Sequence, residues 1–240
     1  MTIRLTFLST SGGDPVPGTR FGDASPGERD LAAARAARAD LPAHTRAVRA
    51  PSLRCRRTAE ALGLAAACEP ALRDLDLGVW CGRTADEVAA AEPHAFSAWL
   101  TDPDAAPHGG ESVRRFCRRT ADWLDAVADE PGHVLAVTEP AVVRAALVHA
   151  LAAPARAFWR FDVPPLTPVS LTWQHGHWDV GMNPAASGPP RRFTVIHQGP
   201  HRQAGRDGAH TLVPSAGAWA HPLRYPRADG VGLAFTFTGP

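Results

Sequence analysis

The feature that most constrains the fold of this chain is a repeated alternation between short apolar runs and longer stretches with helical spacing. A strand rich in β-branched and aromatic residues is expected at 3–8, and a helix is expected at 28–41. A short strand at 47–50 precedes a helix that begins at residue 53, with Ser52 as the expected N-cap. Strands that alternate with helices predict an α/β fold of three layers, in which helices flank a mostly parallel sheet.

The rest of the first 182 residues continues this alternation. Further helices are expected at 85–91, 112–128 and 141–151, the second of them strongly amphipathic. Strands are expected at 134–137, 169–173 and 178–182, and the last two flank the sequence "QHGH", which predicts a hairpin. Trp80 and Trp123 are expected in the core. Because ligands of such sheets bind beyond the carboxyl ends of the strands, the candidate site comprises the loop "STSGG" at 9–13 and the loop "TEP" at 138–140.

Composition excludes several classes of chemistry. The chain has 25 basic residues and none is lysine, which excludes Schiff-base catalysis and P-loop lysine chemistry and leaves arginine forks suited to carboxylate or phosphate. A formal net charge of +1 gives no reason to expect nucleic acid or a membrane as partner. The four cysteines are widely spaced, and the apolar start is too short for a signal peptide, so a cytoplasmic protein is expected.

From residue 183 onward the sequence is punctuated by Gly and Pro, which predicts a domain at 1–182 and an extension at 183–240. This extension either packs on the preceding domain, our working expectation, or is partly mobile. Its four histidines, His197, His201, His210 and His221, lack metal-site spacing. "HGH" at 175–177 could chelate a metal, but an exposed hairpin tip is the preferred interpretation. No metal or cofactor is expected.

The order of several motifs resembles the histidine phosphatase superfamily, whose fold is that of the phosphoglycerate mutases. In that family the first strand is followed by Arg-His-Gly, whose His accepts the phosphoryl group. Here "FLSTSGG" places Thr10 at the Arg, Ser11 at the His and Gly12 at the Gly. The stretch "APSLRCRRTAEAL" is similar to the segment that carries the second phosphate-binding Arg, which is Arg54.

Three more segments extend the resemblance across 1–182. "LRDLDLGVWCGRTADEV" is similar to a family segment in which Asp74 and Cys81 stand at two acidic positions. "GGES" at 109–112 matches as it stands and contains Glu111. "VLAVTEPAVVRAAL" is similar to the segment of the second His, with Glu139 for that His and Pro140 for the following Gly.

The resemblance implies a site in which an imidazole nucleophile, two Arg and a second His surround a phosphoryl group. Of these four positions only Arg54 is kept, so the chain is interpreted as a divergent member that lacks both catalytic histidines. We expect a repurposed enzyme that acts on a small polar or anionic metabolite by carboxylate acid/base catalysis, with specialised metabolism as one setting. Glu139 and Ser11 are the expected catalytic residues. The expected substrate-binding residues are Arg54, Thr10, Gly12, Glu111 and Cys81. A homodimer is possible.

Two other functions stay open. The chain could be a non-catalytic binding or scaffold protein in which Glu139 pairs with Arg54. It could also be a residual phosphatase that borrows a histidine from the extension. For Cys81, a pocket nucleophile and a small buried residue are both open, the buried residue being preferred.

Overall fold

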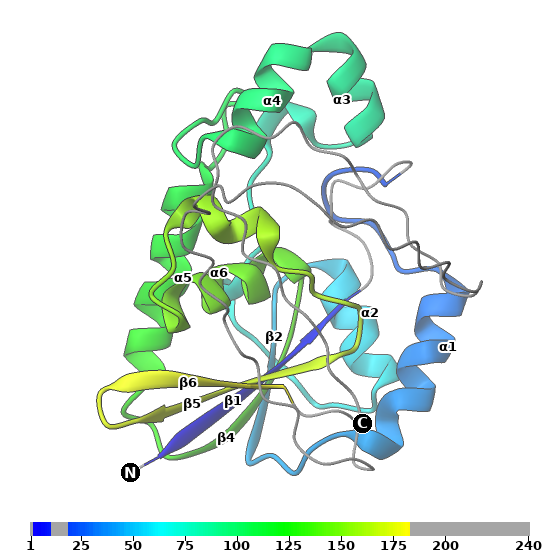
Figure 1. Ribbon diagram of the computed structural model, residues 1–240. Coiled ribbons are helices and arrows are strands. Elements are labelled where there is room, and N and C mark those ends of the chain that lie inside the picture. The colour runs from blue at the N-terminus through cyan, green and yellow to red at the C-terminus, as the bar shows by residue number, and fades with distance from the viewer. Residues whose placement is uncertain (1, 11–18, 183–240) are drawn as a thin grey trace, which may run out of the picture. The chain divides into compact units, whose positions relative to one another are not determined.

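β1 (Ile3–Ser9) is the strand around which the sheet is built, because it pairs with β4 on one side and with β5 on the other. The structure is a computed structural model that describes residues 2–10 and 19–182 (Figure 1). The other strands are β2 (Arg46–Arg49), β3 (Ala67–Cys68), β4 (Gly132–Thr138), β5 (Pro168–Gln174) and β6 (His177–Met182). The strand order in this six-stranded sheet is β3-β2-β4-β1-β5-β6. The first four strands in this order run parallel and β5 is antiparallel to both neighbours, which confirms the predicted mostly parallel sheet.

Two helical layers cover the sheet. The α-helices are α1 (Glu28–Ala37), α2 (Leu53–Ala61), α3 (Ala85–Ala91), α4 (Pro93–Thr101), α5 (Val113–Val127) and α6 (Pro140–Ala150), and the 3-10 helices are η1 (Arg38–Asp40), η2 (Pro70–Leu72), η3 (Gly78–Trp80) and η4 (Ala155–Arg160). Phe7 packs its ring against Trp123 of α5 at a centroid distance of 6.3 Å. Its neighbour Leu8 lies beside Ala37 of α1 and Leu62 at the end of α2. Because consecutive side chains of a strand point to opposite faces, α1 and α2 cover one face and α5 and α6 the other (Figure 1).

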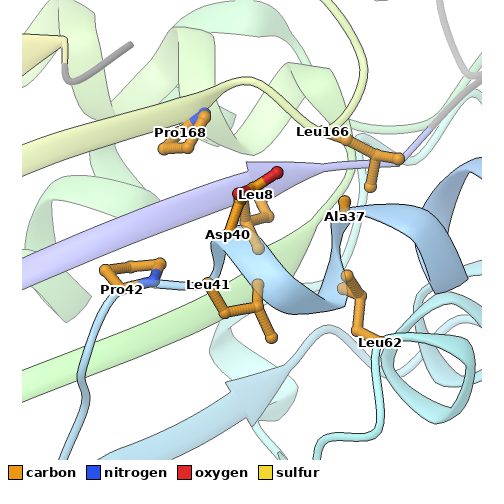
Figure 2. A pocket seen from close by; sticks show the side chains of 8 residues that line it. All are labelled: Leu8, Ala37, Asp40, Leu41, Pro42, Leu62, Leu166 and Pro168. Atoms are coloured by element: carbon orange, nitrogen blue, oxygen red, sulfur yellow. The ribbon is translucent and has the colours of Figure 1, made fainter. Parts of the chain in front are cut away.

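A small cavity marks the junction between β1 and the α1–α2 layer. Its volume is about 80 Å³, and Figure 2 shows its aliphatic lining, to which Asp40 contributes the one charged side chain. The lining residues are Leu8, Ala37, Asp40, Leu41, Pro42, Leu62, Leu166 and Pro168. Neither Glu139 nor Arg54 is among them, so this cavity is separate from the predicted site.

Apart from the short 3-10 helices, the predicted elements agree with the structure except at their ends and in two omissions, strand β3 and helix α4. The helix expected at 28–41 is α-helical only to Ala37 and then tightens into η1. The hairpin is confirmed: His175 and Gly176 form a two-residue connection with φ of 53° and 79°, as a type I′ turn requires. Helix α4 was not predicted, although Pro93 at its first turn is a recognised start signal.

Helices α3 and α4 lie beyond the sheet, at the top of Figure 1, and an aromatic cluster joins them to the rest of the domain. Trp80 and Trp99 contact each other edge to face at 5.5 Å, and both rings contact His108. His108 is fully buried and its Nδ1 accepts the backbone N–H of Gly110, which leaves its proton on Nε2. That Nε2 has no partner among the described residues, and burial lowers the pKa of His108. The ring is therefore neutral and is held by packing. The predicted core positions of Trp80 and Trp123 are confirmed.

Two chain segments cross so closely that only glycine fits. A Cβ atom on Gly78, whose φ is +46°, would lie 2.1 Å from the carbonyl oxygen of His108. A Cβ atom on Gly110 would lie 2.2 Å from the carbonyl oxygen of Asp76. Backbone hydrogen bonds from Val79 to His108 (3.0 Å) and from Glu111 to Asp76 (2.8 Å) close the crossing. The glycines of "LDLGVW" and "GGES" thus allow the two segments to approach closely enough for these backbone hydrogen bonds.

Candidate functional site

Glu139 lies where the polypeptide leaves β4 and enters α6. It is the N-cap residue of α6, yet its side chain makes no capping hydrogen bond. Pro140 occupies the first turn, where its missing N–H costs nothing because that group has no helical partner. The Glu139 side chain is instead enclosed, with a relative exposure of 1%, and its Oε2 has no hydrogen-bond partner among the described residues. A buried carboxyl group is therefore held at the carboxyl edge of the sheet.

The same edge brings three parallel strands together. The Thr10 amide donates to the Thr138 carbonyl at 2.8 Å, and the Ala50 amide donates to the Val137 carbonyl at 2.9 Å. These bonds place the ends of β1, β4 and β2 side by side. Helix α2 begins just beyond β2, so its first turn lies beside Glu139.

Burial decides the ionisation of Glu139. Desolvation raises the pKa of this carboxyl group, opposed by hydrogen bonds from Ser52 and Cys55 and by the charge of Arg54. Ser52 also accepts the Cys55 amide at 3.0 Å as the N-cap of α2, as predicted. Burial, followed by the nearby Glu139, raises the pKa of the Cys55 thiol, which therefore stays protonated. The site thus presents a carboxyl group, whose acid form is favoured by burial, beside two neutral side chains.

Arg54 supplies the cation of this edge. Its side chain is buried, and its Nη2 donates to the Gly22 carbonyl at 3.1 Å. Asp23 binds the first turn of α2 instead of the guanidinium, since its oxygens accept the amides of Leu53 (2.7 Å) and Arg54 (3.2 Å). In the part of the chain that the structure describes, Arg54 forms no ion pair, and none joins it to Glu139. The pairing considered for a non-catalytic protein is not what the structure shows.

The remaining predicted site residues divide into three groups. Thr10 lies at the edge, buried, and its Oγ1 has no partner among the described residues. Ser11 and Gly12 lie outside the described residues. Cys81 is exposed, so the preferred interpretation of a small buried residue was wrong.

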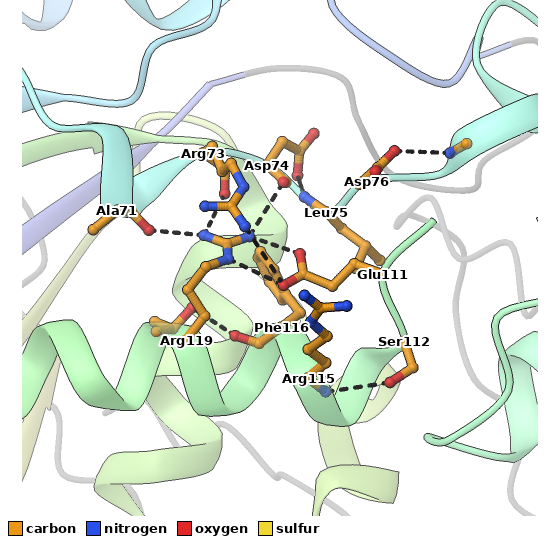
Figure 3. Close-up of polar contacts among 12 residues, drawn as sticks. Ala71, Arg73, Asp74, Leu75, Asp76, Glu111, Ser112, Arg115, Phe116 and Arg119 are labelled. Carbon is orange, nitrogen blue, oxygen red and sulfur yellow. Dashed lines mark hydrogen bonds and ion pairs between the residues drawn. The ribbon is translucent and has the colours of Figure 1, made fainter. Parts of the chain in front are cut away.

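Glu111 is engaged elsewhere, as Figure 3 shows. Its oxygens accept Nε (3.1 Å) and Nη2 (2.8 Å) of Arg119, and Arg73 lies 4.0 Å away. Arg119 also donates to the carbonyls of Ala71, Arg73 and Asp74, so it clamps α5 to η2 and to the segment after it. We interpret Glu111 as part of this clamp and leave it out of the function proposed below.

The sequence analysis missed two neighbours of Glu139, and it named Asp74 without giving it a role in the site. Ser52 was predicted only as an N-cap, and Cys55 was not singled out. Their three-residue spacing on a helix that starts at this edge was the available signal. Asp74 acts electrostatically on Cys55, so its carboxylate belongs to the surroundings of the site.

No group of three metal-ligating side chains occurs among residues 2–10 and 19–182. At the hairpin, His177 pairs with Asp179 at 3.2 Å and both imidazoles are exposed, in line with the preferred interpretation of "HGH". Within the same ranges no helix is long and apolar enough to cross a bilayer.

Comparison with known proteins identifies the family. The sequence profile of the histidine phosphatase superfamily (branch 1) matches residues 25–183. The chain belongs to this superfamily. The match begins after β1, so it does not include the Thr10–Gly12 segment. It does include the first turn of α2 and the β4–α6 junction.

Individual members of the superfamily are similar over part of the chain. Glucosyl-3-phosphoglycerate phosphatase of Mycobacterium tuberculosis is 31% identical over 135 residues, which are 52% of this chain and 59% of that protein. The chain thus spans about three-fifths of that relative's length. The corresponding enzyme of Mycolicibacterium vanbaalenii is 41% identical over 71 residues, 25% of this chain and 32% of that protein.

Solved structures of the superfamily share the fold. The mycobacterial glucosyl-3-phosphoglycerate phosphatase in complex with VO3 superimposes with a TM-score of 0.64 at 26% identity, covering 75% of this chain and 97% of that one. The α-ribazole phosphatase from Shigella flexneri gives 0.60 at 20% identity, covering 79% and 99%. These likenesses confirm the predicted phosphoglycerate-mutase-like fold.

Proposed function

We propose that this chain is an enzyme that moves protons through Glu139 on a small polar or anionic metabolite, without a phosphohistidine intermediate. The observation that carries the proposal is the buried Glu139 carboxyl group, whose Oε2 has no partner among the described residues at the ligand-binding edge of the sheet. A buried polar atom without a partner is costly to maintain, which favours a role for it in binding or catalysis.

Charge argues against the ordinary chemistry of the superfamily. By the resemblance, Ser11 and Glu139 stand at the two histidine positions and Thr10 at an arginine position. Two like charges about 4 Å apart repel by roughly 4 kcal/mol at an effective dielectric constant of about 20. An ionised Glu139 would therefore oppose a phosphoryl group, and a protonated one would still leave it without an imidazole nucleophile.

The roles follow from the protonation states. Glu139 in its acid form gives a proton to the substrate, and the resulting carboxylate takes one back in the return half of the cycle. Arg54 anchors an anionic group of the substrate through its charge and planar donors. Thr10 and Ser11 supply hydroxyl groups. Elimination, isomerisation, cyclisation and hydrolysis are all compatible with such a pair of steps, and specialised metabolism is a setting in which such reactions occur.

The test begins with a thermal-shift screen of polar and anionic metabolites on the full chain, followed by turnover assays on each compound that binds. We expect Glu139→Gln to lower kcat by about 100-fold or more, because general acid–base catalysis contributes about that much. Glu130→Gln is the same change at an exposed glutamate just before the start of β4, at the opposite end of this strand from Glu139, and should leave kcat unchanged. Equal turnover by Glu139→Gln and the unsubstituted protein would rule the proposal out, and binding without Glu139-dependent turnover would favour a non-catalytic binding protein.

A residual phosphatase is the second candidate, since the relatives named above are phosphatases. Its histidine would have to come from the extension, whose residues lie outside the described ranges. An aryl phosphate assay on the full chain separates the two functions. Hydrolysis that disappears on substitution of His197, His201, His210 or His221 by Gln supports the phosphatase, and so does a phosphoryl adduct on a nitrogen atom of the chain.

A further inference from the structure

The unpartnered groups at the carboxyl edge can donate hydrogen bonds, that of Glu139 in its acid form. The guanidinium of Arg54 uses one donor on Gly22, and its other donors have no partner among the described residues. The Oε2 atom of Glu139 and the Oγ1 atom of Thr10 are buried and likewise unpartnered there. An acceptor with more than one oxygen atom would match several donors at one edge.

We propose that this site binds the carboxylate group of a monoanionic organic acid in preference to a phosphate group. The inference rests on the function proposed above, whose substrate class it narrows. A carboxylate is planar and matches the fork of Arg54, to which it can make paired hydrogen bonds. The second oxygen is then free to accept from the acid form of Glu139 or from the Thr10 hydroxyl.

The charges around the site disfavour a dianion. Arg54 is the cation that acts on Glu139. The Asp23 carboxylate holds the first turn of α2 beside it, and Asp74 acts on the neighbouring Cys55. Among the described residues, a phosphate dianion bound at Arg54 would be repelled by the Asp23 and Asp74 carboxylates, and each repulsion grows in proportion to the charge of the ligand. A carboxylate carries half that charge and is repelled half as strongly.

Glu139 gives this binding a characteristic pH dependence. As an acid it donates to the ligand, and as a carboxylate it repels the ligand. The groups that face it are Ser52 and Cys55 on α2, the guanidinium of Arg54, and Asp74 beyond Cys55. Affinity for a carboxylate should therefore fall as the pH rises and Glu139 ionises.

The experiment titrates the full chain with acetate, propanoate and inorganic phosphate at constant ionic strength, following backbone amide shifts by NMR. We expect the organic acids to shift Thr10, Arg54 and Glu139 and to bind about tenfold or more tightly than phosphate. Arg54→Gln should weaken acetate binding by about tenfold or more, because hydrogen bonds to charged groups contribute about that much. Arg54→Lys keeps the charge and should weaken it less. Arg57→Gln, on the exposed face of the same helix, should have no effect.

Glu139→Gln separates the inference from the proposed function. Glutamine keeps a donor but cannot ionise, so acetate should still bind to this variant and its affinity should no longer depend on pH. If the variant binds acetate in this way and also keeps full turnover, the proposed function fails and the carboxylate site stands. If turnover depends on Glu139 but phosphate binds as tightly as acetate, the carboxylate site fails and the proposed function stands. Equal effects of Arg54→Gln and Arg57→Gln, or no Arg54-dependent acetate shift, would also overturn the inference.

Discussion

Glu139 occupies an N-cap position without acting as a cap. N-cap positions favour Ser, Thr, Asp and Asn, whose short side chains reach back to the first turn. The longer Glu139 makes no such bond in α6 and instead meets Ser52 and Cys55 of α2. Pro140 has no backbone N–H, so the first turn of α6 has one donor fewer that needs a capping partner. The Glu139 side chain at this junction is thus available for contacts with α2.

The ionisation of Glu139 has a measurable cost in stability. Its pKa is raised in the folded state, so the unfolded chain loses this proton at lower pH than the folded chain does. The folded state is therefore favoured fully below the ordinary range of a glutamate, and the advantage is lost as the pH rises through the folded-state pKa. Gln at this position is neutral throughout. We predict that Glu139→Gln becomes more stable than the unsubstituted protein as the pH rises from 5 to 8, measured by urea unfolding. A growing advantage of the unsubstituted protein would contradict this, and Glu130→Gln is the matched control.

His108 should behave in the opposite sense. Burial lowers its pKa, so the unfolded chain takes up a proton first as the pH falls. The contribution of the neutral ring to stability is present above about pH 6.5 and is lost as the pH falls below it. We predict that His108→Phe, which keeps an aromatic ring beside Trp80 and Trp99, reduces the loss of stability between pH 7 and pH 5. His94→Phe on the exposed face of α4 should leave that loss as it is, and an unchanged pH slope in His108→Phe would refute the assignment.

Ser52 at the start of helix α2 affects both the stability of that helix and the pKa of Glu139. Ser52 caps it by accepting the Cys55 amide and also lowers the pKa of Glu139. We predict that Ser52→Ala lowers the free energy of unfolding by about 1 kcal/mol, as loss of an N-cap does. The same change should move the ionisation of Glu139 to higher pH, because an opposing hydrogen bond is lost. Thr84→Ala removes the N-cap of α3 at similar cost and should leave Glu139 unaffected. If Glu139 ionises at the same pH in Ser52→Ala and in Thr84→Ala, Ser52 does not form the hydrogen bond with Glu139.

Helix α5 is tied to the segment after η2 by the clamp of Arg119 and Glu111 (Figure 3). Their side chains are 15% and 6% exposed, so removal of one partner leaves a buried charge behind. We predict that Arg119→Met lowers the free energy of unfolding by about 3–5 kcal/mol, measured by chemical denaturation. Arg114→Met on the same helix loses an exposed partner, Asp104, and should have little effect. A small effect of Arg119→Met would show that the clamp does not stabilise the fold.

For the molecule as a whole, the sequence predicted those helices and strands that have a clear hydrophobic periodicity or a local start signal. The strand at the start of the chain and the amphipathic helix that became α5 follow from alternation and from helical spacing, and both are present. β3 was missed because it has two residues and both are exposed, which leaves no apolar pattern to detect. Helix α4 was missed although Pro93 in its first turn is a start signal for a helix.

Of the candidate site, only the residues that lie in the motifs could be predicted from the sequence. Arg54 and Glu139 follow from segments that resemble the superfamily, and the common edge follows from parallel strands. The contacts of Ser52 and Cys55 with Glu139 join two helices that are far apart in the sequence, so no local pattern contains them. The ion pair of Glu111 with Arg119 was not predicted, because the motif does not show which way the carboxylate points.

Isotope-edited infrared difference spectroscopy of the full chain against Glu139→Gln reports directly on the protonation state of Glu139. We expect a carboxylic acid C=O band that persists at pH values well above the ordinary pKa range of a glutamate and is missing in the variant. We also expect acetate to strengthen this band more than phosphate does. If Glu139 instead ionises at the same pH as an exposed glutamate and phosphate binds beside it, both the proposed acid/base role and the carboxylate site are wrong.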